Sequence, residues 1–515
     1  MSNTETFAAQ IKGGYTFKGE SIKLGMAMLD KQVVPDTVIG LPLKTMNRHG
    51  LIAGATGTGK TKTLQVIAEA LSDASVPVLM MDIKGDLSGI AAAGTENEKI
   101  KERYQLLNET YRPAAYPVEL LSLSDEKGAK LRATVTEFGP VLLSKVLDLN
   151  DTQAGLMAML FKYCDDNGLP ILDLKDLIKV LQYAGDEGKA NIEKDYGKIS
   201  TTSTGTILRK VIELQQQGAD NFFGEASFDV NDLMRMNSDG RGMINILRVT
   251  DMQDRPKLFS TFMLQMLAEL YATLPEEGDM DKPKLVLFID EAHLIFKEAG
   301  KVLLSQIETI VKLIRSKGVG VFFCTQNPQD VPASVLSQLG LKIQHALRAF
   351  TANDRKDIKQ TAENYPISEF YKTEDLITQL GIGEALVTML NEKGIPTPLA
   401  HVFLVSPRSR MDILSDGEIN AITNNSKLIP KYNQQIDSES AYEILSKRLE
   451  AIANASVAQP LPRYEMPRQT TAAPKKASTR EEKSWIEKAV TSSAGKQVQR
   501  SIVRTLFGVI QKMFK

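Results

Sequence analysis

Apolar residues along this chain gather into short runs, and several of these runs end on a charged or polar residue. Runs of this length, bounded by turn residues, are typical of strands buried on both faces of a sheet. Stretches with helical spacing lie between them. The alternation predicts a parallel α/β sheet whose carboxyl edge carries the polar residues. The runs are residues 49–53, 76–81, 242–247, 285–289, 318–324, 383–390 and 401–405.

The remaining stretches have a different pattern. Residues 1–48 hold short strand-like pieces, such as 15–18, which we expect to add edge strands to the sheet. Residues 96–240 have mainly helical spacing and predict a mostly helical insertion. Polar helical segments fill 411–459. Residues 460–515 combine a Pro- and Lys-rich linker with a basic amphipathic helix, which fits a membrane surface, nucleic acid, a partner protein, or packing on this or a neighbouring chain.

The run at 49–53 leads into Gly54-Ala-Thr-Gly-Thr-Gly-Lys-Thr61, and a helical segment follows. This is the pattern G-x-x-x-x-G-K-[ST] of a phosphate-binding P-loop in its strand–loop–helix context. Its glycines let backbone N–H groups turn around an anion at a helix N-terminus. Lys60 would reach the β- and γ-phosphates, and the Thr61 hydroxyl would hold Mg²⁺. The expected nucleotide contacts are Gly54, Ala55, Thr56, Gly57, Thr58, Gly59, Lys60, Thr61 and Thr63.

A second motif supplies acids. The run at 285–289 ends in Asp290-Glu291, which has the form of a Walker B strand. We expect Asp290 to hold the Mg²⁺ shell and Glu291 to act as the general base that polarises water. A strand that merely ends on acids would look the same, but the upstream P-loop favours the catalytic interpretation.

Three further residues are candidates for catalysis. Gln326 follows the run at 318–324 and Thr325. If this run forms a strand beside the Walker B strand, Gln326 lies near the γ-phosphate. A Gln-Asn-Pro turn is the structural alternative. Arg315 and Arg348 are each candidates for an arginine finger that reaches a neighbouring subunit's nucleotide, with a surface or helix-capping role as the alternative.

Asp82 and Lys84 follow the run at 76–81. They either face the nucleotide or a neighbouring subunit, or they form a turn that ends the strand and caps a helix.

Composition narrows the class of protein. The chain has 515 residues and a net charge of −1, from 62 Lys+Arg and 63 Asp+Glu, so no basic excess points to DNA coating. Cys164 and Cys324 are far apart, and the four histidines show no zinc spacing. The polar N-terminus lacks a signal-peptide core, and no apolar run approaches 18 residues, so we expect a cytoplasmic protein without an integral membrane segment.

Taken together, several segments resemble the HerA–FtsK superfamily of P-loop ATPases. They are residues 48–61, Asp290-Glu-Ala-His293, Arg315-Ser-Lys-Gly-Val-Gly and Thr325-Gln-Asn-Pro328. More closely, residues 15–405 resemble bacterial HerA-like helicase proteins. The resemblance implies a homo-oligomer, in the form of a hexameric ring, that moves DNA or protein-linked DNA. It also implies hydrolysis of ATP with Mg²⁺ by Lys60, Thr61, Asp290, Glu291 and Gln326, assisted by an arginine acting in trans.

The expected fold is an α/β P-loop NTPase of the RecA/ASCE type, with a mainly parallel sheet, helices on both faces, a helical insertion and a helical C-terminal tail. The expected segments are the N-terminal strands and P-loop part of the core at 1–95, the insertion at 96–240, the rest of the core at 241–410, a helical extension at 411–459, and the linker and basic helix at 460–515.

Two functions compete. The first is a ring-forming ATPase motor that acts on DNA. The alternative is an ATP-driven conformational switch or scaffold for a protein partner, bound through the tail, without DNA translocation. A P-loop kinase or GTPase fits less well, because Asp290-Glu291 favours water as the acceptor and the sequence has no Asn-Lys-x-Asp motif for guanine.

Overall fold

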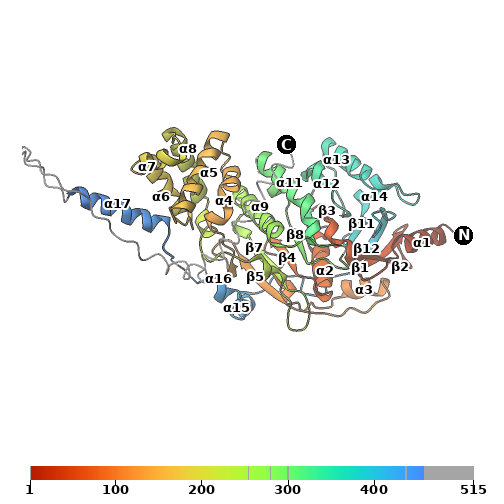
Figure 1. Cartoon of the computed structure of the whole chain (residues 1–515). Coiled ribbons are helices and arrows are strands. Elements are labelled where there is room, and N and C mark those ends of the chain that lie inside the picture. The colour runs from red at the N-terminus through yellow and green to blue at the C-terminus, as the bar shows by residue number, and fades with distance from the viewer. Residues whose placement is uncertain are drawn as a thin grey trace, which may run out of the picture. The chain divides into compact units, whose positions relative to one another are not determined.

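The computed structural model describes residues 2–252, 255–278, 280–297, 301–434, 436 and 438–457 (Figure 1). The linker and basic helix expected at 460–515 lie outside the described residues. The chain clusters into two compact units. The sheet unit comprises Met1–Ala133, Lys145–Leu149 and Ile212–Ile436. The helical unit comprises Thr134–Ser144, Asn150–Val211 and, among the described residues that follow, 438–457.

A twelve-stranded sheet forms the centre of the sheet unit, with the order β2-β1-β12-β11-β10-β3-β9-β8-β4-β7-β5-β6. The strands are β1 (Ser21–Leu29), β2 (Gln32–Pro42), β3 (Gly50–Ala53), β4 (Val78–Asp82), β5 (Val118–Ser122), β6 (Ala129–Lys130), β7 (Ile244–Arg248), β8 (Leu285–Ile289), β9 (Val319–Thr325), β10 (Leu341–Gln344), β11 (Glu384–Met389) and β12 (Ala400–Leu404).

The sheet is mainly parallel, as the sequence predicts. Every neighbouring pair from β10 across to β6 is parallel, whereas β10–β11, β11–β12, β12–β1 and β1–β2 are antiparallel. The apolar runs form β3, β4, β7, β8, β9, β11 and β12, so the predicted α/β fold class is confirmed. The carboxyl ends of β3, β9, β8 and β4 meet at one edge, which is where ligands bind in such sheets.

Helices surround this sheet and fill the helical unit (Figure 1). The sheet unit contains α1 (Asn3–Gly14), α2 (Lys60–Asp73), α3 (Glu98–Leu106), α9 (Pro256–Thr273), α10 (His293–Lys297), α11 (Lys301–Ile314), α12 (Ala333–Leu336), α13 (Ala352–Glu363), α14 (Thr373–Gln379), α15 (Asp416–Asn424) and α16 (Ile429–Tyr432). The other helices are α4 (Val135–Val146), α5 (Asp151–Asp166), α6 (Leu174–Gly185), α7 (Lys189–Tyr196), α8 (Thr201–Gln216) and α17 (Ala441–Val457).

Both faces of the sheet are buried, which explains why the strands are apolar throughout. Neighbouring residues of a strand point to opposite faces. Phe322 packs on Phe288 with ring centroids 5.1 Å apart, in the cluster that also contains Ile67 of α2. Phe323 packs instead on Phe296 of α10, at 5.4 Å, on the other face. The central strands are therefore held between helices and present only their ends to solvent.

Within the expected insertion, the helices concentrate in the helical unit. Residues 96–240 also contain β5 and β6, two short strands that belong to the sheet. In the helical unit, Asp176 accepts hydrogen bonds from the Tyr442 amide, at 2.8 Å, and from the Ser440 hydroxyl. This buried carboxylate fixes the start of α17 to α6.

The N-terminal residues differ in detail from the expectation. Residues 3–14 form α1, whose capping box is Ser2 with Glu5, and residues 15–18 form no strand. β1 and β2 do occupy the edge of the sheet. Tyr15 anchors the segment, because its hydroxyl donates to the carbonyls of Val387 and Pro398 at 2.9 and 2.8 Å. Within the described ranges, no helix is long and apolar enough to cross a bilayer.

Candidate active site

The P-loop lies between β3 and α2, with a backbone that only glycine adopts easily. Gly54 has φ 152° and Gly59 has φ 112°. A Cβ added to Gly54 would lie 2.5 Å from the His345 Cβ, so a side chain there would collide with the strand behind the loop. Lys60 and Thr61 begin α2 directly after this turn. The loop therefore presents its amides at a helix N-terminus, as an anion site requires.

Lys60 is held back against its own loop. Its ammonium donates to the carbonyl oxygens of Gly54 at 2.6 Å and Ala55 at 3.1 Å. Burial, reinforced by the positive charge of Lys84, lowers the pKa of Lys60. A phosphate at the loop would offer this ammonium an anionic partner in place of two neutral carbonyls.

His345, directly after β10, supports the loop from behind, and no motif or spacing in the sequence marks it as a functional residue. Its amide donates to the Ala53 carbonyl at 2.7 Å, and its ring Nε2 lies 3.0 Å from the Thr63 hydroxyl. Burial lowers the pKa of His345 to about 4, so the ring is neutral at pH 7. Thr63, an expected nucleotide contact, is buried in this interaction.

The acids lie at the end of β8, one strand away from the P-loop. β9 lies between β3 and β8, which is the arrangement that the interpretation of Gln326 required. Asp290 is 6% exposed, and burial raises its pKa to about 6, with the charge of Lys84 acting against that rise. Glu291 is 5% exposed and has a left-handed backbone, with φ 46°. A strained residue at a strand end is typical of a functional site.

Glu291 is contacted from three sides. Its carboxylate forms an ion pair with Lys84 from the turn after β4, and its Oε2 lies 3.1 Å from the His293 Nδ1. Gln326 donates to its Oε1 at 3.4 Å. Burial acts to raise the pKa of Glu291, but hydrogen bonding and charge from Lys84, with His293 and Gln326, outweigh it and the pKa is lowered.

Gln326 connects the acids to the P-loop. While its amide nitrogen faces Glu291, its Oε1 lies 3.5 Å from the Thr56 hydroxyl. Thr325, before it, is fixed by donating to Asp330 at 2.8 Å. Side chains from the segments that directly follow β3, β8 and β9 thus converge at the carboxyl edge of the sheet.

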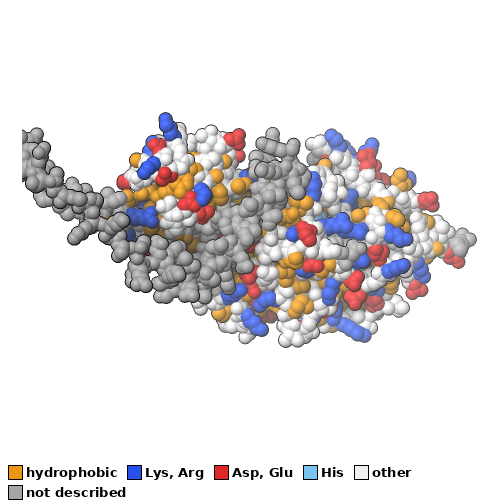
Figure 2. Space-filling view, in the orientation of Figure 1, with side chains coloured by type: hydrophobic (Ala, Val, Ile, Leu, Met, Phe, Trp, Pro, Cys, Tyr) orange, Lys and Arg blue, Asp and Glu red, His pale blue; other side chains and the backbone are white. Residues whose placement is uncertain are grey.

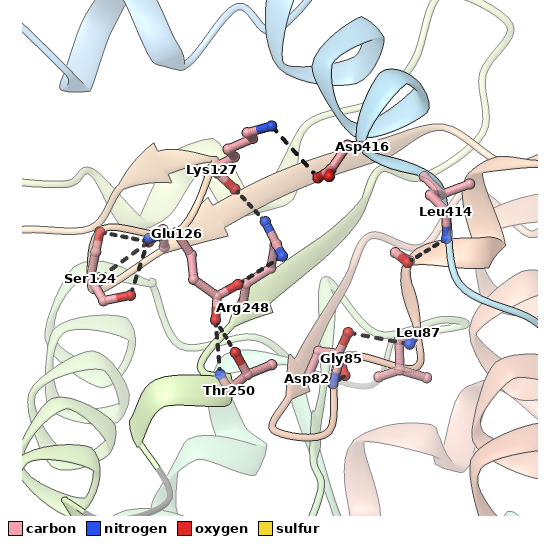
Figure 3. Close-up of polar contacts among 12 residues, drawn as sticks. Asp82, Gly85, Leu87, Ser124, Glu126, Lys127, Arg248, Thr250, Leu414 and Asp416 are labelled. Carbon is pink, nitrogen blue, oxygen red and sulfur yellow. Dashed lines mark hydrogen bonds and ion pairs between the residues drawn. The ribbon is translucent and has the colours of Figure 1, made fainter.

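Asp82 and Lys84 have different surroundings although they are two residues apart. Asp82 accepts from the amides of Gly85 and Leu87 at 2.7 and 3.2 Å (Figure 3). It also accepts from the Asp86 amide at 3.0 Å, and these bonds shape the turn after β4. Burial raises its pKa to about 7. For Asp82 the structure agrees with the strand-ending turn, and this turn carries Lys84 to Glu291.

Arg315 and Arg348 lie at opposite edges of the sheet. Arg315 precedes β9, in the 3₁₀ turn η6 (Arg315–Lys317), and so lies at the edge away from the P-loop. Arg348 follows β10, at the same edge as the P-loop, and donates to the Thr378 carbonyl at 2.8 Å. Both are exposed. Within the described residues, neither forms a hydrogen bond or ion pair with the P-loop of its own chain.

The donor set fits Mg²⁺ held chiefly through a nucleotide. Among the residues that the structure describes, no group of three or more His, Cys, Asp and Glu is arranged to hold a metal. Mg²⁺ usually takes one or two protein ligands together with phosphates and waters. A half-buried Thr61 at the start of α2 and a buried Asp290 at the end of β8 match this requirement.

The comparisons with known proteins agree with this geometry. The family model described as helicase HerA-like C-terminal matches residues 28–513. A DNA double-strand break repair helicase HerA of Sulfurisphaera tokodaii is 22% identical over 369 residues, covering 70% of this chain and 66% of that protein. A probable helicase of Methanocaldococcus jannaschii is 26% identical over 394 residues, covering 72% of this chain and 68% of that protein. The chain thus spans about two thirds of these relatives.

Solved structures show the same fold. Plasmid coupling protein TrwB in complex with the ATP analogue ADPNP superposes with a TM-score of 0.52 at 15% identity, over 79% of this chain and 95% of that chain. TrwB in complex with ADP and Mg²⁺ gives a TM-score of 0.51 at 14% identity, over 79% and 94%. The P-loop ATPase architecture is therefore shared with TrwB, and the chain belongs to the helicase HerA-like C-terminal family.

Proposed function

We propose that this protein binds ATP with Mg²⁺, hydrolyses it to ADP and phosphate, and uses the reaction to drive a motor that acts on DNA. The observation that carries the hydrolytic part is the convergence of the P-loop with Glu291 and Gln326, since the Gln326 amide lies against both Thr56 and Glu291. Sites that only bind nucleotide have no need for a buried carboxylate beside the phosphate position.

Binding would begin at the P-loop. The amides of residues 54–61 surround the phosphates, and Lys60 exchanges the Gly54 and Ala55 carbonyls for the β- and γ-phosphate oxygens. Thr61 and Asp290 would hold Mg²⁺, which when bound neutralises charge on the phosphates. Thr58 donates from its hydroxyl to the Ala55 carbonyl at 2.7 Å, which keeps the loop in its curved form without ligand.

Hydrolysis would depend on Glu291. Its carboxylate accepts a proton from water as the water oxygen forms a bond to the γ-phosphorus, and the bond to the bridging oxygen breaks to release ADP. Gln326 lies between Glu291 and Thr56, so its amide is suited to orient that water. A buried position strengthens these interactions because water screens them less.

Family membership supports the DNA part, since relatives are named as DNA repair helicases. The surface charge gives no further support for a function on DNA. The net charge is −1, and on the face shown in Figure 2 the basic and acidic side chains are interspersed. Binding within a ring needs only local positive charge on the pore, supplied once per subunit. The motor hypothesis therefore includes a homo-oligomeric ring, completed by Arg315 or Arg348 of a neighbouring copy.

An ATP-driven switch or scaffold for a protein partner is the second candidate. The balanced charge favours it, because proteins that bind DNA through phosphates need a basic excess along the contact. It predicts slow turnover that DNA does not change. Deleting residues 456–515 would then abolish partner binding while ATP binding persists.

The test is the steady-state ATPase rate with and without single- and double-stranded DNA, run beside a mass measurement of the assembly in ATP. We expect DNA to stimulate turnover and ATP to favour a closed oligomer. An ATPase rate that DNA does not change, together with a mass that corresponds to a single chain in ATP, would exclude the motor. Lys60→Ala should lose ATP binding, and Glu291→Gln should bind ATP without hydrolysing it. Exposed Lys356→Ala and Glu374→Gln are the matched controls, expected to behave as wild type.

A further inference from the structure

The turn that precedes β11 lies directly against the P-loop. The Gly383 amide donates to the Thr58 carbonyl at 3.2 Å, and a Cβ on Gly59 would lie 3.4 Å from the same amide nitrogen. Ile382 is the residue before this contact, and 74% of its surface is exposed. An apolar side chain is thus held in solvent beside the loop that would hold phosphate.

This turn is fixed by a side chain from a distant segment. Arg103 of α3 donates to the carbonyls of Ile382 at 3.0 Å and Gly383 at 3.1 Å. The same guanidinium donates to the Leu404 carbonyl at 2.7 Å and lies 4.0 Å from the centroid of the Phe403 ring. Three carbonyls and one ring satisfy this half-buried cation, so the position of Ile382 is set before any ligand arrives.

The other end of the turn is fixed as well. The Gly381 amide donates to the Glu384 Oε2 at 2.9 Å, and the same oxygen lies 2.9 Å from the His401 Nε2. Gly383 has φ 74°, and a Cβ there would lie 2.7 Å from the Arg103 guanidinium, so the turn needs glycine at this point. The hydrogen bonds at both ends of the turn therefore hold the exposed Ile382 side chain in one place beside the P-loop.

Sheet order gives the direction of a nucleotide across the P-loop. The catalytic residues lie on the β9 and β8 side of β3, so the γ-phosphate belongs on that side. The α-phosphate, sugar and base must then extend toward the opposite side, which is formed by β10 and β11. The turn with Ile382 directly precedes β11 and contacts the loop at Thr58, on the expected course of the sugar and base.

We propose that Ile382, held by the Arg103-anchored turn at 381–383, is the apolar wall on which the purine ring of the bound nucleotide packs. The proposal rests on the proposed function, since it assumes that the P-loop holds a nucleoside triphosphate. A flat ring against an exposed aliphatic side chain removes apolar surface of both from water. It recognises a purine by shape and apolar surface, and it does not by itself distinguish adenine from guanine.

The test compares two ligands on two matched variants of the full chain. Binding of ATP and of inorganic tripolyphosphate, each with Mg²⁺, is measured by calorimetry for wild type, Ile382→Glu and Ile367→Glu. Ile367 is a second exposed isoleucine of the sheet unit, which controls for adding an acid at an exposed position. We expect Ile382→Glu to weaken ATP binding about tenfold or more, a loss of at least about 1.4 kcal/mol. Binding of tripolyphosphate should change much less, and Ile367→Glu should change neither.

The outcomes separate this proposal from the one it rests on. If wild type binds neither ATP nor tripolyphosphate, the proposed function fails and the base wall fails with it. If wild type and Ile382→Glu bind ATP equally, only the base wall is overturned. Unchanged ATP binding together with a shift of the mass toward single chains would assign Ile382 to a contact with a second copy, which also overturns it. Equal losses of ATP and tripolyphosphate affinity would indicate a damaged P-loop and count against a base contact.

Discussion

The ion pair between Lys84 and Glu291 leads to the sharpest prediction. As long as the Lys84 ammonium contacts Glu291, that carboxylate oxygen is not free to take a proton from water. Lys84→Met removes the charge and keeps most of the aliphatic length. The Glu291 side chain would retain His293 at 3.1 Å and Gln326 at 3.4 Å. We therefore expect the variant to hydrolyse ATP faster than wild type when no DNA is present.

The size of the effect follows from exposure. The Lys84 side chain is 37% exposed and that of Glu291 only 6%, so water screens the pair from one side. An ion pair of this kind is worth about 1 kcal/mol after screening. If breaking it forms part of the barrier, its removal speeds the basal rate about fivefold. The loss of the lysine also allows the pKa of Glu291 to rise, which makes the carboxylate a stronger base.

The assay is phosphate release at saturating ATP and Mg²⁺ without DNA, across pH 5 to 9. Lys127→Met is the matched control, because its ammonium lies 3.7 Å from Asp416 in a different ion pair (Figure 3). It should leave the rate unchanged. A rate for Lys84→Met that falls tenfold or more at unchanged ATP affinity would refute the reasoning, because Lys84 would then assist the reaction. A rate equal to wild type with an unshifted pH profile would show that the pair is no part of the barrier.

Three further predictions concern the same edge of the sheet. Burial raises the pKa of Asp290 from 3.8 to about 6, so Asp290→Asn should raise the free energy of unfolding by about 3 kcal/mol at pH 8. Denaturant unfolding at a series of pH values should show this gain shrinking as the pH falls from about 6 to about 4, because the native carboxyl becomes protonated over that range. Gly54→Ala should lower the free energy of unfolding by about 1–3 kcal/mol and abolish ATP binding, because the added Cβ would lie 2.5 Å from the His345 Cβ. Urea unfolding measures the stability and calorimetry measures ATP binding, and a variant as stable as wild type that binds ATP would contradict the prediction. If Arg348 or Arg315 acts in trans, mixing its alanine variant with chains that cannot bind ATP should restore part of the ATPase rate, and no recovery for either would exclude that role.

Local pattern predicted the parts of this fold that depend on local physics. A strand buried on both faces must be apolar along its whole length, so the runs ending at Ala53, Ile289 and Thr325 could be recognised without a structure. The P-loop could also be recognised from the sequence, because the backbone angles of this one turn require its glycines. Val118–Ser122 was missed as a strand, since it is five residues long and stands within a stretch of helical spacing.

Contacts between segments that are distant in the chain could not be predicted from the sequence. The pair of Lys84 with Glu291 depends on β4 lying next to β8, and the support of Thr63 by His345 depends on β10 lying next to β3. No residue spacing encodes these neighbours. The same holds for Arg103, whose carbonyl partners are Ile382 and Gly383 in the turn before β11 and Leu404 at the end of β12; for the Gly383 carbonyl the separation in sequence is 280 residues. Charged residues in helices are usually solvated, so the sequence does not indicate that Arg103 holds the turn before β11 in place.

The sheet order also constrains how the chain reaches its native state during synthesis. Among the strands that the structure describes, the P-loop strand β3 pairs with β9 and β10, and the N-terminal hairpin of β1 and β2 is joined to the sheet through β12. The Tyr15 hydroxyl finds its Val387 partner 372 residues later. An emerging chain therefore leaves apolar strands of this sheet exposed until residues near 404 have left the ribosome. Such non-local topology folds slowly and is open to aggregation meanwhile, so we expect this protein to depend on chaperones and to tolerate C-terminal truncation only beyond β12.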